Sequence, residues 1–477
     1  MSGSPIPLAE PTSGSTPVAL QGRAVLALST LVAGLLIFTT LGAAVVPGLA
    51  RYQADLGISP SAAAWLFTGF LLSSSIATPA AGRLGDMYGK RRALVWLFVV
   101  MGAGALIGGL ATGLPAFIIG QLLLGTGGGV YPLAFAIARE ELPRDSVAVA
   151  IGLLGGIATA GGLLGFLVGG RLADAYSNRW LLAAAALLLL LALISRVTIP
   201  SSRVRVPGSL DWLGMVLFGG PIAALLLAIT FAPDHGWTSR RVLLLTAAGA
   251  IGLAVWTSYE ARRTQPFIDI DLLRRRFMWA PCLIALVVGF STVVVFVVVP
   301  QLVVLPRETG YGFGGSTTQA GLYLIPTAIV FLIAGPAAGV LERSIGPRPV
   351  IVLGVAVMAL PIAALARWHD EPWHIIVSSS LVGAGYGLAF TTMTSMIVRA
   401  VDAEHTGVAT GISTIARTIG ETLGTQVGLS IIAANINAST QIPEQRGFSL
   451  AFVVGAAVAV IAVLAALAVP RKNTGGF

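Results

Sequence analysis

The sequence predicts an all-α integral membrane protein with about fourteen membrane-spanning helices. Hydrophobic residues make up 56% of the 477-residue chain and charged residues only 10%. In soluble domains, charged residues make up roughly a quarter of the chain. Apolar windows of about 20 residues, the length that a spanning helix needs, recur along the chain between short polar breaks. Spanning strands would be about ten residues long and would alternate polar with apolar side chains, which these windows do not.

The fourteen apolar windows are expected to be helices near residues 24–46, 61–83, 93–112, 115–138, 146–170, 180–199, 212–231, 241–259, 279–303, 317–341, 349–366, 374–398, 407–434 and 447–470. The first window is longer than the apolar region of a cleaved signal, about 7–15 residues, so it is expected to be retained as helix one. Residues 1–22 are rich in Ser, Pro and Gly, a composition typical of a disordered tail.

The positive charges alternate from loop to loop, although the net charge is +9. With the N-terminus inside, 20 of the 29 Lys and Arg residues fall on cytoplasmic segments, and Arg417 lies within the membrane. Positive residues favour the cytoplasmic side, which predicts a multi-pass protein of the cell membrane with both termini cytoplasmic. A nucleic-acid binder would gather its basic residues into one patch, so no nucleic-acid partner is expected.

The chain contains an internal repeat, because four features recur in the same order at offsets of 253 to 259 residues. For example, the loop GRLGDMYGKRR (82–92) aligns with GVLERSIGPRP (339–349) at an offset of 257. Transporter folds are often built from repeated halves. We therefore expect a cytoplasmic tail (1–22), an N-terminal six-helix bundle (23–200), a two-helix insert with flanking loops (201–265), a C-terminal six-helix bundle (266–470) and a second tail (471–477).

Two stripes of glycines spaced by four residues occupy equivalent helices of the two halves. This spacing places small residues on one helix face and lets two backbones approach closely. The stripes indicate either packing alone or a close helix pair that slides between two states. They are Gly161, Gly165 and Gly169 in the first half, and Gly420, Gly424 and Gly428 in the second.

The loop 82–92 is predicted to be a conformational latch between helices two and three. Its glycines permit a tight turn, its aspartate can accept from a helix N-terminus with positive partial charge, and its arginines can pair with acids or anionic lipid headgroups. The alternative is a turn that serves only topology. The latch residues are Gly82, Arg83, Gly85, Asp86, Gly89, Arg91 and Arg92.

The same loop resembles the signature loop of the major facilitator superfamily, and the stripe ending in Gly169 and Gly170 resembles that family's antiporter motif. The segments DWLG (211–214), GWTS (236–239) and ARTIGETLG (416–424) are similar to patterns of its fourteen-helix drug:proton antiporter group. The resemblance spans residues 24 to 470. It implies two six-helix bundles plus an insert, and multidrug efflux by proton antiport through alternating access, with the proton gradient as energy source and no cofactor.

Three positions depart from the family pattern. Phe38 stands where the family often has an aspartate, Gln121 where it has an arginine, and Phe166 where it has a proline. The first two departures remove ionisable groups that the family uses. They keep open an alternative function, an uncoupled facilitator or importer of a small organic solute.

Arg417 and Glu421 are the only ionisable residues more than a few positions from a window end. A charge at a helix centre costs about 2.5–3.5 kcal/mol on insertion scales, which makes such a residue a functional candidate. Four residues apart, the two side chains share one helix face and can pair. We expect Glu421, with Arg417, to be the proton or ion coupling site. The alternative is a permanent pair that only stabilises the helix.

Polar and aromatic residues at mid-depth are candidates for a substrate cavity. An apolar pocket with a few polar groups suits a lipophilic or amphipathic small molecule, a cationic one included. The candidates are Thr39, Trp65, Gln121, Tyr131, Gln319, Tyr323, Tyr386, Phe390 and Gln426. Besides this ligand, the expected partners are protons and membrane lipids.

The sequence offers little for enzyme chemistry. The four histidines lie in loops or at window ends, so no buried metal cluster is indicated. The run GTGGG (125–129) follows no strand, and no Walker lysine follows a glycine-rich loop, which argues against an ATP-driven pump. The sequence therefore favours a transporter over the remaining alternative, a polytopic membrane enzyme or sensor.

Overall fold

The computed structural model describes residues 17–56, 60–201, 211–263, 275–402, 406–437, 440 and 442–467. These residues form helices and turns, apart from one antiparallel β-bridge between Ile436 and Pro443. The all-α prediction is therefore confirmed. The expected tail 471–477 and the first sixteen residues lie outside the described residues.

Seven helices build the N-terminal bundle. A 3₁₀ turn, η1 (Thr126–Gly129), joins α4 to α5, so these two form one span. The bounds are α1 (Pro17–Leu56), α2 (Pro60–Tyr88), α3 (Lys90–Leu110), α4 (Leu114–Gly125), α5 (Val130–Glu141), α6 (Arg144–Tyr176) and α7 (Trp180–Thr198). The expectation of a disordered tail up to residue 22 was wrong at its end, because α1 begins at Pro17. Proline suits the first helical turn, and the residues that follow it, Val18 to Gln21, can continue a helix.

The remaining helices are the insert pair, α8 (Trp212–His235) and α9 (Arg240–Glu260), and the C-terminal bundle. The bundle contains α11 (Arg276–Val304), α12 (Thr317–Ile345), α13 (Pro347–Leu365), α14 (Pro372–Ala400), α15 (Thr406–Ala433) and α16 (Gln445–Leu467), with a short 3₁₀ turn η2 (Arg307–Thr309). Among the described residues, eleven helices are long and apolar enough to cross a membrane. With α2, α8 and α15 the total reaches the fourteen predicted.

Glycines at the two repeat loops end one helix and begin the next. Gly89 (φ 96°) separates α2 from α3, and Gly346 (φ 85°) separates α12 from α13. Positive φ is accessible to glycine without the strain that a Cβ atom brings. The two residues differ by 257 positions, so the backbone repeats the turn where the sequence repeats it.

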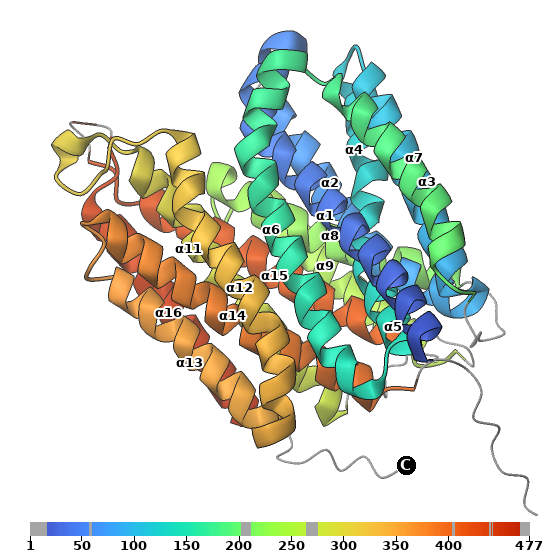
Figure 1. Ribbon diagram of the computed structural model, residues 1–477. Helices are drawn as coiled ribbons and strands as arrows, with labels where there is room; N and C mark the ends of the chain where they lie inside the picture. The colour runs from blue at the N-terminus through green and yellow to red at the C-terminus, as the bar shows by residue number, and fades with distance from the viewer. Residues whose placement is uncertain are drawn as a thin grey trace, which may run out of the picture.

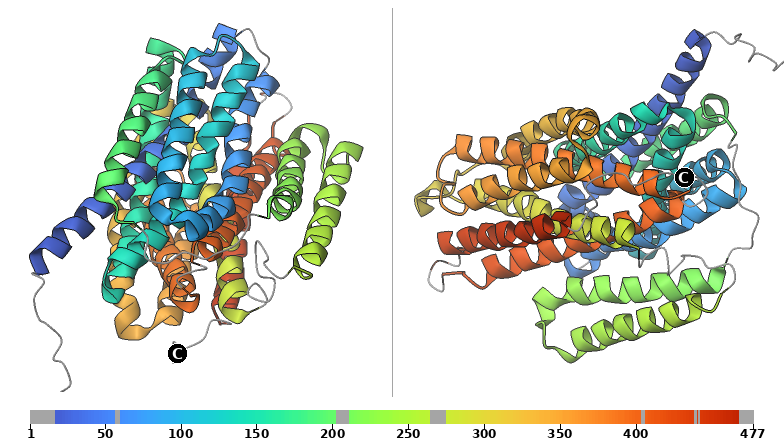
Figure 2. Two further views of the ribbon diagram at one scale, coloured as in Figure 1. Left: turned by 90° about the vertical axis from the view of Figure 1, so that its right-hand side faces the viewer. Right: turned by 90° about the horizontal axis from the view of Figure 1, so that it is seen from below.

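The two bundles lie side by side, and the insert lies outside them. In Figure 1 the helices α1 to α7 occupy one side and α11 to α16 the other, while Figure 2 shows α8 and α9 as a separate pair along the outer edge. The insert packs against both bundles, since Phe218 and Ile222 of α8 share a buried cluster with Val408 and Ile415 of α15, and Leu72 of α2 packs on the same cluster.

Candidate functional site

The bundles meet along a first seam between α2 and α15. A Cβ atom at Gly82 would lie 2.5 Å from the carbonyl carbon of Gly407, and one at Gly411 would lie 3.1 Å from the Cα atom of Pro79. The backbones therefore touch at the end of α2 and the start of α15. We call the membrane face that carries this contact and the loop 82–92 the loop face.

A second seam, between α6 and α12, repeats the first at the same face. A Cβ atom at Gly152 would lie 2.2 Å from the carbonyl carbon of Gly335, and one at Gly339 would lie 2.9 Å from that of Ala148. The internal repeat relates the two seams. Gly339 of the second seam occupies the position that Gly82 has in the first, and Gly152 the position that Gly411 has. Two pairs of touching backbones thus join the bundles at the loop face.

The predicted latch surrounds the first seam. Asp86 is buried near the backbone N–H of Val408 in the first turn of α15, where the helix dipole favours a negative charge. Among the described residues neither of its carboxylate oxygens has a hydrogen-bond partner. Arg139 of α5 donates to Thr406 of α15, which adds a side-chain bond between the bundles.

The basic residues of the latch have different surroundings. Lys90 pairs with Glu140, and Arg91 donates to the carbonyl oxygens of Arg196 and Ile199, 3.5 and 3.4 Å away. Arg83 is buried, and Arg92 is exposed. Gly85 packs under Leu133, so its missing side chain admits α5.

Arg417 and Glu421 form an ion pair on α15, in which the Arg417 Nη1 donates to the Glu421 Oε1. The side chain of Arg417 is 13% exposed, and that of Glu421 is 32% exposed. The carboxylate therefore has room for a second partner, while the guanidinium is enclosed. Arg417 lies ten residues after Gly407, about 15 Å along the helix from the loop-face contact.

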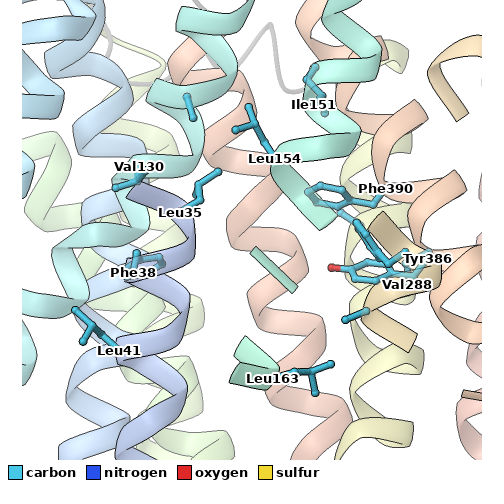
Figure 3. Packing of buried hydrophobic residues seen from close by; sticks show 14 of the residues in the cluster. Leu35, Phe38, Leu41, Val130, Ile151, Leu154, Leu163, Val288, Tyr386 and Phe390 are labelled. Carbon is cyan, nitrogen blue, oxygen red and sulfur yellow. The ribbon is translucent and has the colours of Figure 1, made fainter. Parts of the chain in front are cut away.

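Aromatic rings from both bundles enclose Arg417. Its Cζ atom lies 5.6 Å from the ring centre of Tyr131 on α5 and 5.9 Å from that of Phe390 on α14, within the range of a cation–π interaction. Figure 3 shows Tyr386 and Phe390 side by side, with Phe38 in the other bundle. The rings of Phe135 and Phe390 lie 6.4 Å apart across the two bundles, so an aromatic layer connects them.

Phe38 belongs to the same layer. Its ring stacks on Phe70 at 5.3 Å and meets the edge of Tyr131 at 6.2 Å. The side chain is almost completely buried. An apolar ring therefore fills the position where the resembling family often has a carboxylate.

The structure brings three of the predicted cavity residues together and places others elsewhere. Tyr131, Tyr386 and Phe390 surround Arg417. Gln121 is fully buried, and neither its amide nitrogen nor its oxygen has a hydrogen-bond partner among the described residues. The Thr39 hydroxyl donates to the carbonyl of Leu35 at 2.8 Å on its own helix.

The other candidates have different surroundings or lie outside the described residues. Gln319 is exposed at the start of α12, where it forms a capping box with Ser316, so the expectation of a mid-depth position was wrong. Tyr323 packs edge-on against Phe313, Gln426 is half-buried on α15, and the side chain of Trp65 lies outside the described residues.

The two glycine stripes pack within their own bundles. Cβ atoms at Gly161, Gly165 and Gly169 would lie 2.2 to 2.4 Å from atoms of α1, and those at Gly420 and Gly424 would lie 1.9 and 2.4 Å from carbonyl oxygens of α11. Gly428 has more room, with its nearest contact at 3.6 Å. The stripes therefore make each bundle compact, whereas other glycines form the seams.

Gly82 was among the predicted latch residues, but its seam partners were missed in the sequence although they carry the same signal as the stripes. Gly407 and Gly411 are four residues apart, as are Gly335 and Gly339. Each pair starts or ends a helix near the loop face, so spacing by four was visible. What sequence could not supply was the partner, because both seams join segments more than 180 residues apart.

These features define a polytopic membrane protein built from two similar bundles joined at one face. A family model described as Major Facilitator Superfamily matches residues 26–425 and 301–476. The chain therefore belongs to the major facilitator superfamily.

Three curated relatives show which members of this family the chain is similar to. The chain is 29% identical over 420 residues to an uncharacterized MFS-type transporter, Rv1877, of Mycobacterium tuberculosis, covering 86% of this chain and 60% of the relative. It is 27% identical over 366 residues to the tetracenomycin C resistance and export protein of Streptomyces glaucescens (75% and 66%). It is 26% identical over 397 residues to the multidrug transporter protein MdtP of Bacillus subtilis (82% and 72%).

Among solved structures, the human organic anion transporter MFSD10 shares the fold with a TM-score of 0.63 at 14% identity, covering 95% of this chain and 100% of that one. At this identity the likeness concerns the fold alone. The chain spans about 60% of the length of the M. tuberculosis relative.

Proposed function

We propose that this chain is a secondary transporter that exports amphipathic small molecules from the cell by proton antiport. The observation that carries the proposal is the Arg417–Glu421 pair, whose carboxylate stays 32% exposed between two bundles joined at one face. The names of two relatives, a resistance and export protein and a multidrug transporter, support export of such compounds.

Alternating access would work through the two seams. In this structure the backbones touch at the loop face, which the charge distribution predicts to be cytoplasmic. The described conformation would then face outward. A change to the inward-facing state requires both glycine seams to separate, together with the Arg139 to Thr406 bond.

Proton coupling would follow from competition at Glu421. Protonation removes the negative charge that faces Arg417, and the guanidinium then needs another partner. Deprotonation restores the pair and leaves an exposed carboxylate oxygen for a cationic group of the substrate. A proton and a substrate that bind one site with different preference for the two states can drive exchange.

The aromatic layer would supply the contacts to the substrate. Tyr131 and Phe390 present ring faces to Arg417, and ring faces also attract other cations and apolar surfaces. Because the two rings come from different bundles, a ligand between them would contact both halves. A lipophilic molecule with a cationic group matches this environment and the neighbouring Glu421.

Phe38 favours a second candidate, an uncoupled facilitator. This residue places an apolar ring in the aromatic layer, and it supplies no proton acceptor in helix one. A facilitator would only equilibrate its solute across the membrane.

Dye efflux from cells that express the chain tests the proposal. We expect efflux to stop when an uncoupler collapses the proton gradient. The control variant Asp370→Asn, in an exposed loop, should behave like the wild type with and without the uncoupler. Efflux that reaches equilibrium at an unchanged rate after uncoupling would favour the facilitator.

A further inference from the structure

An apolar groove runs along the outer wall of the N-terminal bundle, between α2 and α3. Its volume is about 520 Å³. Four of its eleven lining residues are alanines, namely Ala77, Ala80 and Ala81 on α2 and Ala93 on α3. Alanine on both helices leaves open the space that leucine or phenylalanine would fill. The proposed transport site uses none of these residues.

The groove starts at the loop face and runs into the span. The helices α2 and α3 are joined at Gly89, and the lining of the groove extends from Arg92 to Val100 along α3. Eight helical residues correspond to about 12 Å. One leaflet of the hydrocarbon core is about 15 Å deep, so the groove covers most of that leaflet.

One end of the groove is basic, and the rest is apolar. Arg92 lines the mouth and is exposed. Within the described residues its guanidinium forms no hydrogen bond or ion pair, unlike Lys90, which pairs with Glu140, and Arg91, which donates to two carbonyls. Tyr88, also at the mouth, exposes half of its surface.

The start of α3 adds positive partial charge at the same place. Its N-cap residue is Gly89, and in the part of the chain that the structure describes no side chain forms a capping hydrogen bond there. The first N–H groups of a helix have no partner within the helix and favour an anion. Together with Arg92, they form a polar end that matches a phosphate group.

We propose that the groove binds one anionic phospholipid. Its headgroup phosphate lies against Arg92 and the start of α3, and one acyl chain follows the alanine walls toward Val100. Basic sites between membrane helices on the cytoplasmic side suit anionic headgroups. Trp96, 69% exposed beside the groove, belongs to a residue type enriched near membrane interfaces.

Native mass spectrometry of the full chain, purified in a mild detergent, tests this site. Dioleoyl phosphatidylglycerol is added to the wild type and to Arg92→Gln, and the first bound lipid is quantified. We expect about tenfold weaker binding of this lipid to the variant. Phosphatidylcholine carries the same phosphate, but its choline cation offsets the charge. We therefore expect it to bind the wild type more weakly than phosphatidylglycerol does, and to lose less than tenfold in Arg92→Gln.

Two further variants separate the groove from general surface charge. Arg343→Gln removes an exposed arginine at the end of α12 on the same face, and we expect it to bind the first phosphatidylglycerol like the wild type. Ala93→Leu fills the groove while keeping Arg92, and we expect it to weaken binding as much as Arg92→Gln does. If Ala93→Leu lowers the melting temperature of the protein, Ala77→Leu is used in its place to fill the groove.

Equal binding by wild type, Arg92→Gln and the filled groove would overturn the proposal. An equal loss in Arg92→Gln and Arg343→Gln would also overturn it, because it would indicate non-specific attraction to the loop face. The number of bound lipids does not depend on transport. A failure of the proposed export function therefore leaves this test unchanged.

Discussion

Replacing Gly82 with alanine is expected to weaken the closed arrangement of the loop face. The new Cβ atom would lie 2.5 Å from the carbonyl carbon of Gly407 and 2.9 Å from the backbone nitrogen of Val408. Both neighbours are backbone atoms of α15, so no side-chain rotation can relieve the contact. The two helices have to move apart.

The size of the effect follows from these distances. Carbon atoms in contact are normally about 3.5–4.0 Å apart, so α2 and α15 must separate by about 1 Å. Overpacking of this kind costs about 1–3 kcal/mol. If the open arrangement lacks the contact, the equilibrium between the two states shifts by about 5-fold to 150-fold toward opening.

Electron paramagnetic resonance can measure this shift between two spin labels. In a Cys282→Ser background, which removes the single cysteine, labels are attached at Tyr88→Cys on α2 and Asp402→Cys before α15. Both positions are exposed. We expect Gly82→Ala to add a population with a longer distance.

Gly162→Ala is the matched control, because a Cβ atom there would meet nothing within 4 Å. It makes the same substitution in a helix of the same bundle and should leave the distance distribution unchanged. A Gly82→Ala distribution identical to that of Gly162→Ala would refute the view that the glycine seam holds the loop face closed.

Three further predictions concern the latch, the topology and the ion pair. Asp86→Asn is expected to slow transport in reconstituted vesicles and to leave substrate binding measurable, because Asp86 faces the start of α15 and not the Arg417 site; unchanged rates would contradict this. A cysteine at Trp237, exposed between α8 and α9, should react with a membrane-impermeant reagent added outside, and labelling only from the cytoplasm would contradict the topology. Glu421→Leu should lower the free energy of unfolding by about 1–3 kcal/mol, which is less than breaking a fully buried pair costs, because the carboxylate is 32% exposed. The double variant Glu421→Leu with Arg417→Leu should regain most of the lost melting temperature. No recovery in the double variant would show that the unpaired Arg417 is not the cause of the loss.

The helices could be predicted from the sequence because hydropathy, segment length and glycine turns are local properties. The predicted windows 180–199 and 212–231 agree with α7 and with the start of α8. Helix ends were less accessible, as α1 continues to Leu56 beyond the window 24–46. The expected window ended before Pro47 and Gly48, whereas the helix continues through them and through the polar segment 51–55.

The site was only partly predictable, for a different reason. Arg417 and Glu421 stood out because charge is rare inside an apolar window. The residues that surround them could not be predicted from the sequence. Tyr131 lies almost 290 residues before Arg417, and only the packing of the two bundles brings the two side chains together. Gln319 shows the converse, because the pattern Ser316-x-x-Gln319 is a capping-box signature that local sequence already offered.

The central claim is that Glu421 couples transport to protons, and Glu421→Gln in proteoliposomes tests it most directly. Glutamine keeps an oxygen that can accept from Arg417 but cannot take up a proton. We expect the variant to retain counterflow exchange of substrate and to lose accumulation driven by a pH difference. A folded variant that still concentrates substrate against its gradient under the same pH difference would contradict the claim.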